Sequence, residues 1–216
     1  MTLAKSRSVY VCSECGAQSP QWLGRCPACG KFGTLVEEIA EPAPEKKAAK
    51  RERSAAAHRP VPLSQVHEEK YMRVSSGIAE LDTVLGGGIV PGSLVLIGGD
   101  PGIGKSTLLT EVSAHLSKER KVLYVSAEES ASQVKMRCAR LGLDSDNLLL
   151  LNETCLEDIE EAIEDEKFVV IDSIQAVYTS ELSSAAGSVG QVRECAGKLQ
   201  RIAKSRGITF FIVGHV

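Results

Sequence analysis

The chain has 216 residues, of which 43% are hydrophobic and 25% are charged, and this ordinary globular composition excludes disorder over the whole length. The formal net charge of −3 gives no overall sign of a nucleic-acid partner, and no apolar run approaches the roughly 20 residues that a membrane span needs. The first ten residues lack the apolar run of a secretory signal, so we expect a cytoplasmic protein.

Residues 1–40 hold four of the seven cysteines, in the pattern C-x2-C, ten residues, C-x2-C: Cys12, Cys15, Cys26 and Cys29. Thiols stay reduced in the cytoplasm, so such tight pairs predict metal ligands rather than disulfides. Two such turns direct four thiolates to one point, and a tetrahedral site of four sulfurs suits Zn²⁺. Gly16 and Gly30 follow the second cysteine of each pair, where the turn often needs a positive φ. We therefore predict a C4 zinc ribbon over residues 1–40.

Two other interpretations of this module stay open. One is a disulfide framework, and the other is an iron site of the rubredoxin type, which the polar and basic surroundings disfavour. Forty residues cannot build an adequate core unaided, so the metal is expected to supply folding free energy. Basic residues surround the module, either as a DNA or protein contact or as a solvated face: Lys5, Arg7, Arg25 and Lys31. The remaining cysteines are isolated, and their pattern assigns them no role: Cys138, Cys155 and Cys195.

Residues 41–60 contain no large apolar residue and consist mostly of alanine, proline and charged residues, which predicts a flexible linker. A transient helix over residues 45–57 is compatible with the good helix formers there, but nothing would anchor it to a core. The chain becomes regular and apolar from about Pro62. We therefore assign residues 61–216 to a second domain.

Strands and helices are expected to alternate along this second domain. Short apolar runs predict strands at Leu94–Ile97, Val122–Val125, Leu148–Leu151, Phe168–Ile171 and Ile208–Val213. Apolar residues at helical spacing predict helices at Gly104–Ser117, Ser130–Leu141, Leu156–Glu164 and Val189–Ser205. Strands that are apolar throughout and separated by helices form a parallel sheet that is buried on both faces, so we expect a doubly wound α/β fold.

The segment GDPGIGKS follows the first strand and opens the first helix, and it satisfies the phosphate-loop pattern G-x4-G-K-[ST]. Its glycines let backbone N–H groups surround a β-phosphate at the positive end of the helix. We expect Lys105 to contact the β- and γ-phosphates, Ser106 to offer its hydroxyl to Mg²⁺, and Thr107 to lie near the α-phosphate. The predicted nucleotide-binding residues of the loop are Gly99, Asp100, Pro101, Gly102, Ile103, Gly104, Lys105, Ser106 and Thr107. A glycine-rich turn without a ligand is the alternative.

Polar side chains follow later strands, at the edge where α/β sheets place their ligands. Asp172 ends the strand at 168–171 and is predicted to hold the Mg²⁺ shell, with a helix cap as the alternative. Glu128 is the preferred general base for the attacking water, and Glu129 is the second choice. Either glutamate is otherwise a first-turn acid that the helix dipole favours. His215 follows the last strand and is predicted to touch the γ-phosphate, although a lone histidine is more often structural.

The segment ELDTVLGGGIVPGSLVLIGGDPGIGKS resembles the RecA-type ATPases, and its combination with CSECG…WLGRCPACG resembles the bacterial DNA-repair members of that family. The resemblance covers essentially the whole chain and implies a RecA-like P-loop fold. It implies ATP hydrolysis with Lys105, Glu128 and Asp172 as catalytic residues, a polar sensor at His215, and zinc on the four clustered cysteines. Such proteins form rings that act on single-stranded DNA and branched recombination intermediates in branch migration. The implied partners are therefore DNA, a RecA-type recombinase and further copies of the chain.

The family continues beyond the position of Val216 with further core strands, a Lys-Asn-Arg-Phe-Gly motif and a domain like that of Lon protease. We therefore expect an incomplete core with weak or no activity. The candidate DNA loop, residues 178–190, carries no lysine or arginine, and nearby only Arg193 is suited to a phosphate contact. One alternative is a clock-like or helicase-like ATPase, which would lack the C4 module. The other is a nucleotide-binding switch, against which the complete set of predicted catalytic residues argues.

Overall fold

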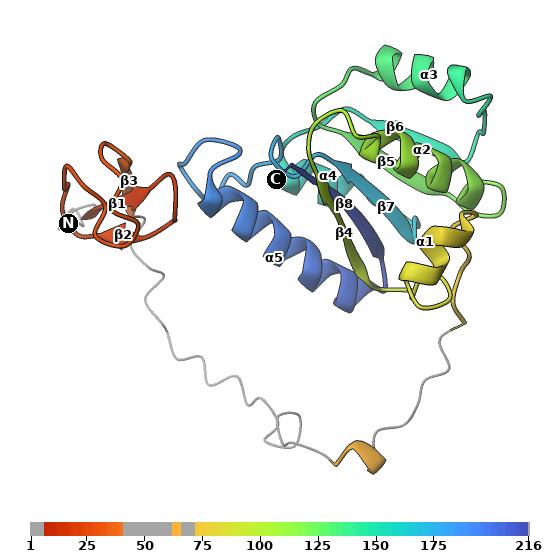
Figure 1. Cartoon of the computed structure of the whole chain (residues 1–216), viewed down its shortest axis with the longest axis horizontal. Helices are drawn as coiled ribbons and strands as arrows, with labels where there is room; N and C mark the ends of the chain where they lie inside the picture. The colour runs from red at the N-terminus through yellow and green to blue at the C-terminus, as the bar shows by residue number, and fades with distance from the viewer. Residues whose placement is uncertain (1–6, 41–61, 66–71, 216) are drawn as a thin grey trace, which may run out of the picture. The chain divides into compact units, whose positions relative to one another are not determined.

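The computed structural model describes residues 7–40, 62–65 and 72–215, and the chain divides into two compact units, 1–71 and 72–216 (Figure 1). The predicted linker at 41–60 lies outside the described residues. The first unit also includes a short 3₁₀ turn at Leu63–Gln65. Among the described residues, the longest apolar stretches of helix fall short of what crossing a membrane requires.

The first unit contains a small antiparallel sheet in the order β2-β1-β3. Its strands are β1 (Arg7–Cys12), β2 (Gln18–Ser19) and β3 (Leu35–Ala40). Among the described residues of this unit, three buried residues form the core, and partly buried neighbours pack on them: Cys12, Cys26 and Leu35, with Tyr10, Ala17 and Leu23. Two of the three buried residues are cysteines of the predicted metal site, so little of this core is independent of that site.

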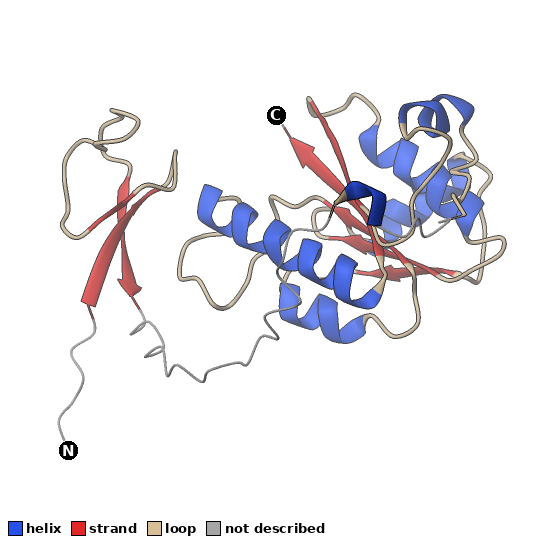
Figure 2. Cartoon of the chain, turned by 90° about the horizontal axis from the view of Figure 1, so that it is seen from below, coloured by secondary structure: helices blue, strands red, loops and turns tan. Residues whose placement is uncertain are grey.

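The second unit contains a five-stranded sheet in the order β4-β8-β7-β5-β6, and every neighbouring pair is parallel. The strands are β4 (Leu94–Gly99), β5 (Val122–Ser126), β6 (Leu148–Leu151), β7 (Phe168–Asp172) and β8 (Thr209–His215). The helices between them are α2 (Lys105–Leu116), α3 (Ala131–Arg140), α4 (Leu156–Ala162) and α5 (Val189–Arg206), and α1 (Ala79–Val84) precedes the sheet. Figure 2 shows helices on both faces of this sheet.

Successive residues of the central strands enter two separate cores. In β5, Val122 and Tyr124 pack with Leu109 of α2 on one face, whereas Leu123 and Val125 belong to the core on the other face. The second core also contains the apolar residues of α4 and α5. Each fully buried aliphatic side chain stabilises such a fold by roughly 1.5–3 kcal/mol. The predicted parallel, doubly wound sheet is therefore confirmed.

Local signals explain where the helices begin and end. A reciprocal capping box between Ser130 and Gln133 starts α3, and Gly207, at φ 65°, ends α5 in the left-handed conformation. The predicted strands and helices of this unit agree with the structure to within one or two residues at nearly every end. The helix predicted over Leu156–Glu164 ends at Ala162, because Ile163 adopts an extended conformation and joins the core.

Candidate nucleotide site and cysteine cluster

The carboxyl ends of four strands lie side by side along one edge of the parallel sheet. Gly99 at the end of β4 pairs with His215 of β8, and Ser126 at the end of β5 pairs with Asp172 of β7. Parallel α/β sheets bind their ligands outside this edge. The predicted loop, magnesium-shell acid, bases and sensor residue therefore come from neighbouring strands of one sheet.

The loop between β4 and α2 has the conformation that a phosphate cradle needs. Gly102 and Gly104 have φ of 82° and 97°, in the left-handed region where any other residue would be strained. Lys105 opens α2, is only 7% exposed, and donates from Nζ to the carbonyls of Gly99 at 2.7 Å and Asp100 at 2.8 Å. Its ammonium group is thus held against the carbonyls at the start of the loop. These features fit a nucleotide β,γ-phosphate.

Asp172 is buried at the end of β7, and it accepts a hydrogen bond at Oδ2 from the hydroxyl of Tyr124 at 2.5 Å. Burial and the negative charge of Asp172 raise the pKa of Tyr124 well above its ordinary value. The tyrosine is therefore a neutral donor, and it fixes the orientation of the carboxylate.

Glu128 follows β5 and meets residues from two other strand ends. The Ser173 hydroxyl donates to Glu128 Oε1, and His215 Nε2 lies 3.4 Å from the same oxygen. The His215 carbonyl in turn accepts from Gln175 Nε2 at 3.2 Å. The structure thus brings together Glu128 and His215, which were predicted from separate segments, and adds Ser173 to them.

Glu129 is directed to a different partner, the buried Arg137 of α3, whose Nη1 donates to Glu129 Oε2. The Glu129 carbonyl accepts from Ser126 Oγ and from Asn152 Nδ2, both at 2.7 Å. These bonds fix the turn after β5 and direct the two adjacent glutamates to different neighbours.

The sequence analysis missed three polar residues beside this site: Tyr124, Arg137 and Ser173. Tyr124 lies inside an apolar run, which predicts a core residue, and the residue is buried in the structure. Arg137 follows Val134 by three residues and is the only other residue of α3 that is buried, so its place on the apolar face is the signal that identifies it.

Two polar side chains of α5, Gln191 and Lys198, bind residues of the loop at 178–190. Gln191, fully buried, accepts from the Thr179 N–H at 2.9 Å and donates to the carbonyls of Thr179, Leu182 and Ser184. Lys198 pairs with Glu157 at 2.9 Å and with Glu181 at 2.8 Å, so its charge is neutralised within the protein.

A pocket of about 600 Å³ lies between α2, α3 and β6, and Thr110 and Tyr124 are among its lining residues. Its lining includes Val134, Cys138, Leu148 and Leu150 but none of the predicted phosphate-loop residues. The volume of a pocket is a weaker guide to the nucleotide site than the chemistry of the phosphate loop, because a phosphate site is a shallow ring of N–H groups.

In the first unit, the sulfur atoms of Cys12, Cys15, Cys26 and Cys29 all lie within 4.8 Å of one another. The Sγ–Sγ distance is 3.7 Å for Cys12 and Cys29 and 3.6 Å for Cys15 and Cys26. A tetrahedron with metal–sulfur bonds of about 2.3 Å has sulfurs roughly 3.8 Å apart, whereas a disulfide needs about 2.05 Å. The geometry therefore fits a four-sulfur metal site.

The two cysteine turns are built alike. The N–H of Gly16 bonds the carbonyl of Cys12, and the N–H of Gly30 bonds the carbonyl of Cys26. Both glycines have positive φ, 71° and 75°, as predicted. Thr34, whose hydroxyl oxygen is 3.2 Å from Cys12 Sγ, lowers the pKa of this thiol to about 6, whereas burial and hydrogen bonds with the other three cysteines raise the pKa of Cys15.

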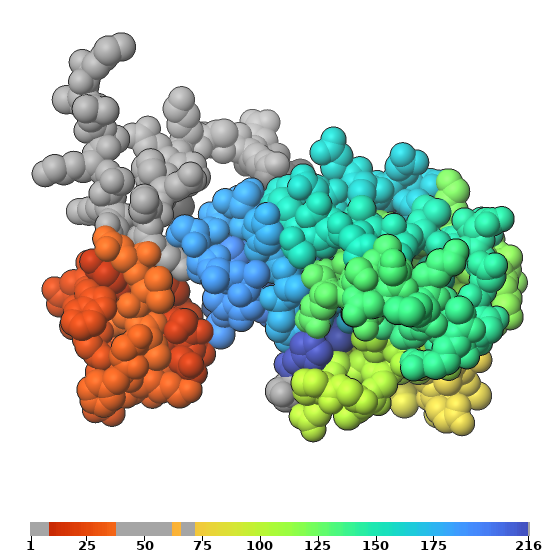
Figure 3. Space-filling model, turned by 90° about the horizontal axis from the view of Figure 1, so that it is seen from above, coloured from red at the N-terminus to blue at the C-terminus, as the bar shows by residue number. Residues whose placement is uncertain are grey.

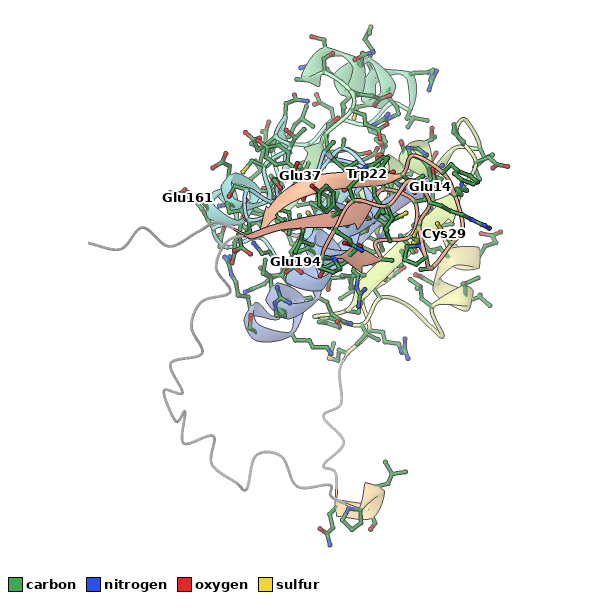
Figure 4. All side chains as sticks on the ribbon, turned by 90° about the vertical axis from the view of Figure 1, so that its left-hand side faces the viewer. Glu14, Trp22, Cys29, Glu37, Glu161 and Glu194 are labelled. Atoms are coloured by element: carbon green, nitrogen blue, oxygen red, sulfur yellow. The ribbon has the colours of Figure 1, made fainter. Side chains whose placement is uncertain are left out.

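Two basic residues of this unit, Arg25 and Lys31, make local contacts. Arg25 donates to the Gly30 carbonyl at 2.7 Å and lies over the ring of Phe32, and Lys31 pairs with Glu14. Trp22, labelled with Cys29 in Figure 4, is 58% exposed. Lys5 lies outside the described residues. The contacts of Arg25 and Lys31 are typical of a solvated face.

Comparison with known proteins shows the family to which this fold belongs. Residues 57–216 match a family model described as an AAA domain, and residues 10–37 match one described as a rubredoxin metal binding domain. The chain therefore belongs to the AAA domain family. It is 50% identical to proteins named DNA repair protein RadA from Bacillus subtilis, over 99% of this chain, and from Listeria monocytogenes, over all of it.

The chain spans about half the length of these relatives, 48% in both cases. Among solved structures, a KaiC-like protein from Pyrococcus horikoshii aligns with a TM-score of 0.57 at 24% identity, over 68% of this chain and 71% of that one. The likeness to the KaiC-like protein shows the RecA-like fold alone. The similarity to the RadA proteins confirms the predicted resemblance to the DNA-repair members of the RecA-type ATPases.

Proposed function

We propose that this chain binds and hydrolyses ATP in recombinational DNA repair. The observation that carries the proposal is the meeting of the phosphate loop, Asp172, Glu128 and His215 along one edge of the sheet. Similarity to the RadA proteins over nearly the whole chain supports DNA repair as the setting. The KaiC-like neighbour favours no second function, since its likeness is one of fold.

In the proposed reaction, each group at this edge has its own task. Lys105 and the N–H groups of the loop hold the β- and γ-phosphates of ATP. The Ser106 hydroxyl and Asp172 Oδ1 would hold Mg²⁺, which when bound neutralises charge on the transferred phosphoryl group. Glu128 accepts the proton of the attacking water at Oε2, because Ser173 and His215 lie at Oε1.

We infer that the four clustered cysteines hold one Zn²⁺. The sulfur spacings support a tetrahedral metal, and the turns direct four sulfurs to one point. Iron in a rubredoxin-type site is the competing metal, and metal analysis distinguishes the two. A disulfide framework is disfavoured, since its sulfurs would lie much closer.

The proposed partners are single-stranded and branched DNA, a RecA-type recombinase and further copies of the chain in a ring. Phosphate affinity rests on lysine and arginine, and Lys198 beneath the loop at 178–190 is already paired with two carboxylates. We therefore assign that loop no phosphate contact.

Replacing Lys105 tests the nucleotide site. We expect Lys105→Ala to weaken binding of a fluorescent ATP analogue by about ten- to a hundredfold, because a charge-assisted contact to the phosphates is lost. Lys118→Ala, an exposed lysine just beyond α2, is the matched control and should bind like the parent. Equal affinity in parent and Lys105→Ala would refute the site.

The DNA part of the proposal is tested by ATP turnover with and without a single-stranded oligonucleotide. We expect faster hydrolysis with single-stranded DNA than with an equal mass of blunt duplex. If DNA does not change the rate of ATP hydrolysis in a protein that binds ATP through Lys105, the DNA part of the proposal is refuted. The chain would then be a nucleotide switch or an ATPase of another process.

A further inference from the structure

Arg137 of α3 is a buried cation for which the proposed reaction has no task. Its side chain is 8% exposed, although α3 lies at the surface of the unit (Figure 3). Nε donates to Thr110 Oγ1 at 3.0 Å, and Nη2 donates to the Tyr124 hydroxyl at 3.1 Å. Nη1 donates to Glu129, and Nη2 lies 4.0 Å from Asp172 Oδ2. One guanidinium thus reaches α2, β5, the turn after β5, and β7.

Two of these partners, Thr110 and Tyr124, hydrogen-bond to the residues that are proposed to bind Mg²⁺. The Thr110 hydroxyl, fully buried, donates to the backbone carbonyl of Ser106 at 2.7 Å. The Tyr124 hydroxyl donates to Asp172 Oδ2 at 2.5 Å. A continuous chain of hydrogen bonds therefore joins Ser106 to Asp172, with Arg137 at its centre.

The chemistry of arginine explains why this residue occupies the centre. Removing a cation from water is costly unless charges and acceptors surround it, and here Glu129 and Asp172 supply the charges. The guanidinium is planar, and its N–H groups point in fixed directions, so partners bonded to it are held at fixed separations. The cation also lies 5.8 Å from the centre of the Tyr124 ring.

We propose that Arg137 is a positioning residue which, through Thr110 and Tyr124, sets the separation of Ser106 and Asp172 that Mg²⁺ binding requires. This inference rests on the proposed ATP site and assigns α3 a role in it. Through Glu129, the same side chain holds the turn that carries Glu128. Residues that orient metal ligands from behind typically change metal affinity by about 10- to 100-fold when replaced.

The test compares Tyr124→Phe and Arg137→Lys with the parent 216-residue chain. Tyr124→Phe keeps the buried ring and removes only the hydroxyl, and Arg137→Lys keeps the charge and removes the fork. Arg140→Lys is the matched control, because Arg140 is exposed on the same helix. Binding of a fluorescent ATP analogue is measured along a Mg²⁺ titration and in excess chelator, and thermal unfolding is recorded without nucleotide.

We expect both variants to need roughly tenfold more Mg²⁺ for half-maximal binding, with affinity in chelator within about twofold of the parent. Arg140→Lys should match the parent in both. An unchanged Mg²⁺ requirement in Tyr124→Phe overturns the proposal even where Arg137→Lys fails to fold. Equal losses with and without Mg²⁺ also overturn it, since they indicate a structural role alone. A parent chain that binds no nucleotide overturns the proposed function as well.

Discussion

Glu128 and Glu129 are adjacent in the chain but have different surroundings. Glu128 receives the Ser173 hydroxyl and lies near His215, whereas Glu129 balances the charge of the buried Arg137. A carboxylate that pairs with a buried guanidinium is committed to that pair, because its loss leaves an uncompensated charge. These contacts favour Glu128 over Glu129 as the base, which agrees with the preference predicted from the sequence.

We expect Glu128→Gln to bind ATP within a few-fold of the parent, because the phosphate loop makes most ground-state contacts. The chemical step should slow by about 10²-fold or more, the scale for losing a general base. Single-turnover hydrolysis, with protein in excess over ATP, measures that step separately from binding, and the comparison is made in a chain extended to the full length of the relatives, where turnover is expected.

Glu129→Gln provides the contrast. It should lower the free energy of unfolding by about 1 kcal/mol, a modest loss because the Glu129 side chain is 41% exposed. Urea unfolding of both variants measures this difference. If Glu129→Gln abolishes hydrolysis while Glu128→Gln preserves it, the base is one residue further along.

At the scale of elements, α4 and α5 hold the loop at 178–190 through Glu157. Its carboxylate accepts from the Thr179 hydroxyl at 2.5 Å, the Ser180 N–H at 3.2 Å and Lys198 at 2.9 Å. Burial opposes ionisation of Glu157, but these hydrogen bonds outweigh it and lower the pKa well below the ordinary value. The loop at 178–190 is thus anchored at its first residues by an acid on a neighbouring helix.

Glu157→Gln should therefore destabilise the unit by about 1 kcal/mol, discounted because the side chain is 35% exposed, and speed amide exchange at Thr179 and Ser180. A depressed carboxyl pKa stabilises the fold fully above the unfolded value of about 4.3, and this contribution is lost as the pH falls below it. The difference between variant and parent in urea unfolding should thus be greatest near pH 7 and shrink below about pH 4.

Glu161→Gln, an exposed acid on the same helix, is the control for this experiment. A difference that persists unchanged to about pH 3 would contradict the assigned role of the Glu157 charge.

Patterns that a single element carries were predictable, and contacts between elements were not. Strand β6 at Leu148–Leu151 and the glycine conformations of the cysteine turns follow from local sequence. The strands of the first unit and α1 were not predicted, because they lack the continuous apolar run that marks β6: β3 includes Glu37 and Glu38, and α1 includes Glu80 and Asp82. The spacing from Val134 indicates that Arg137 is buried, but its contact with Tyr124 of β5 depends on how α3 packs, which no local pattern predicts.

At the scale of the whole molecule, the two units owe their stability to different sources. The α/β unit buries apolar side chains on both faces of a five-stranded sheet. Among its described residues, the cysteine unit has three buried core residues, two of which are cysteines of the candidate metal site. A core of this size cannot offset the conformational entropy of some thirty ordered residues, so we expect a bound metal to contribute the difference.

Removing the metal should therefore unfold the first unit and leave the second folded. We expect one Zn²⁺ per chain by elemental analysis, and Cys26→Ser should lose it, because three sulfurs no longer complete the tetrahedron. Trp22, the single tryptophan, lies in this unit, so its fluorescence reports the unfolding, while the ATP-analogue affinity of the second unit stays unchanged. Cys138→Ser, on α3, is the matched control and should keep the metal. Stoichiometric iron would replace zinc as the assignment, and metal-free reduced protein with a folded first unit would refute the metal site.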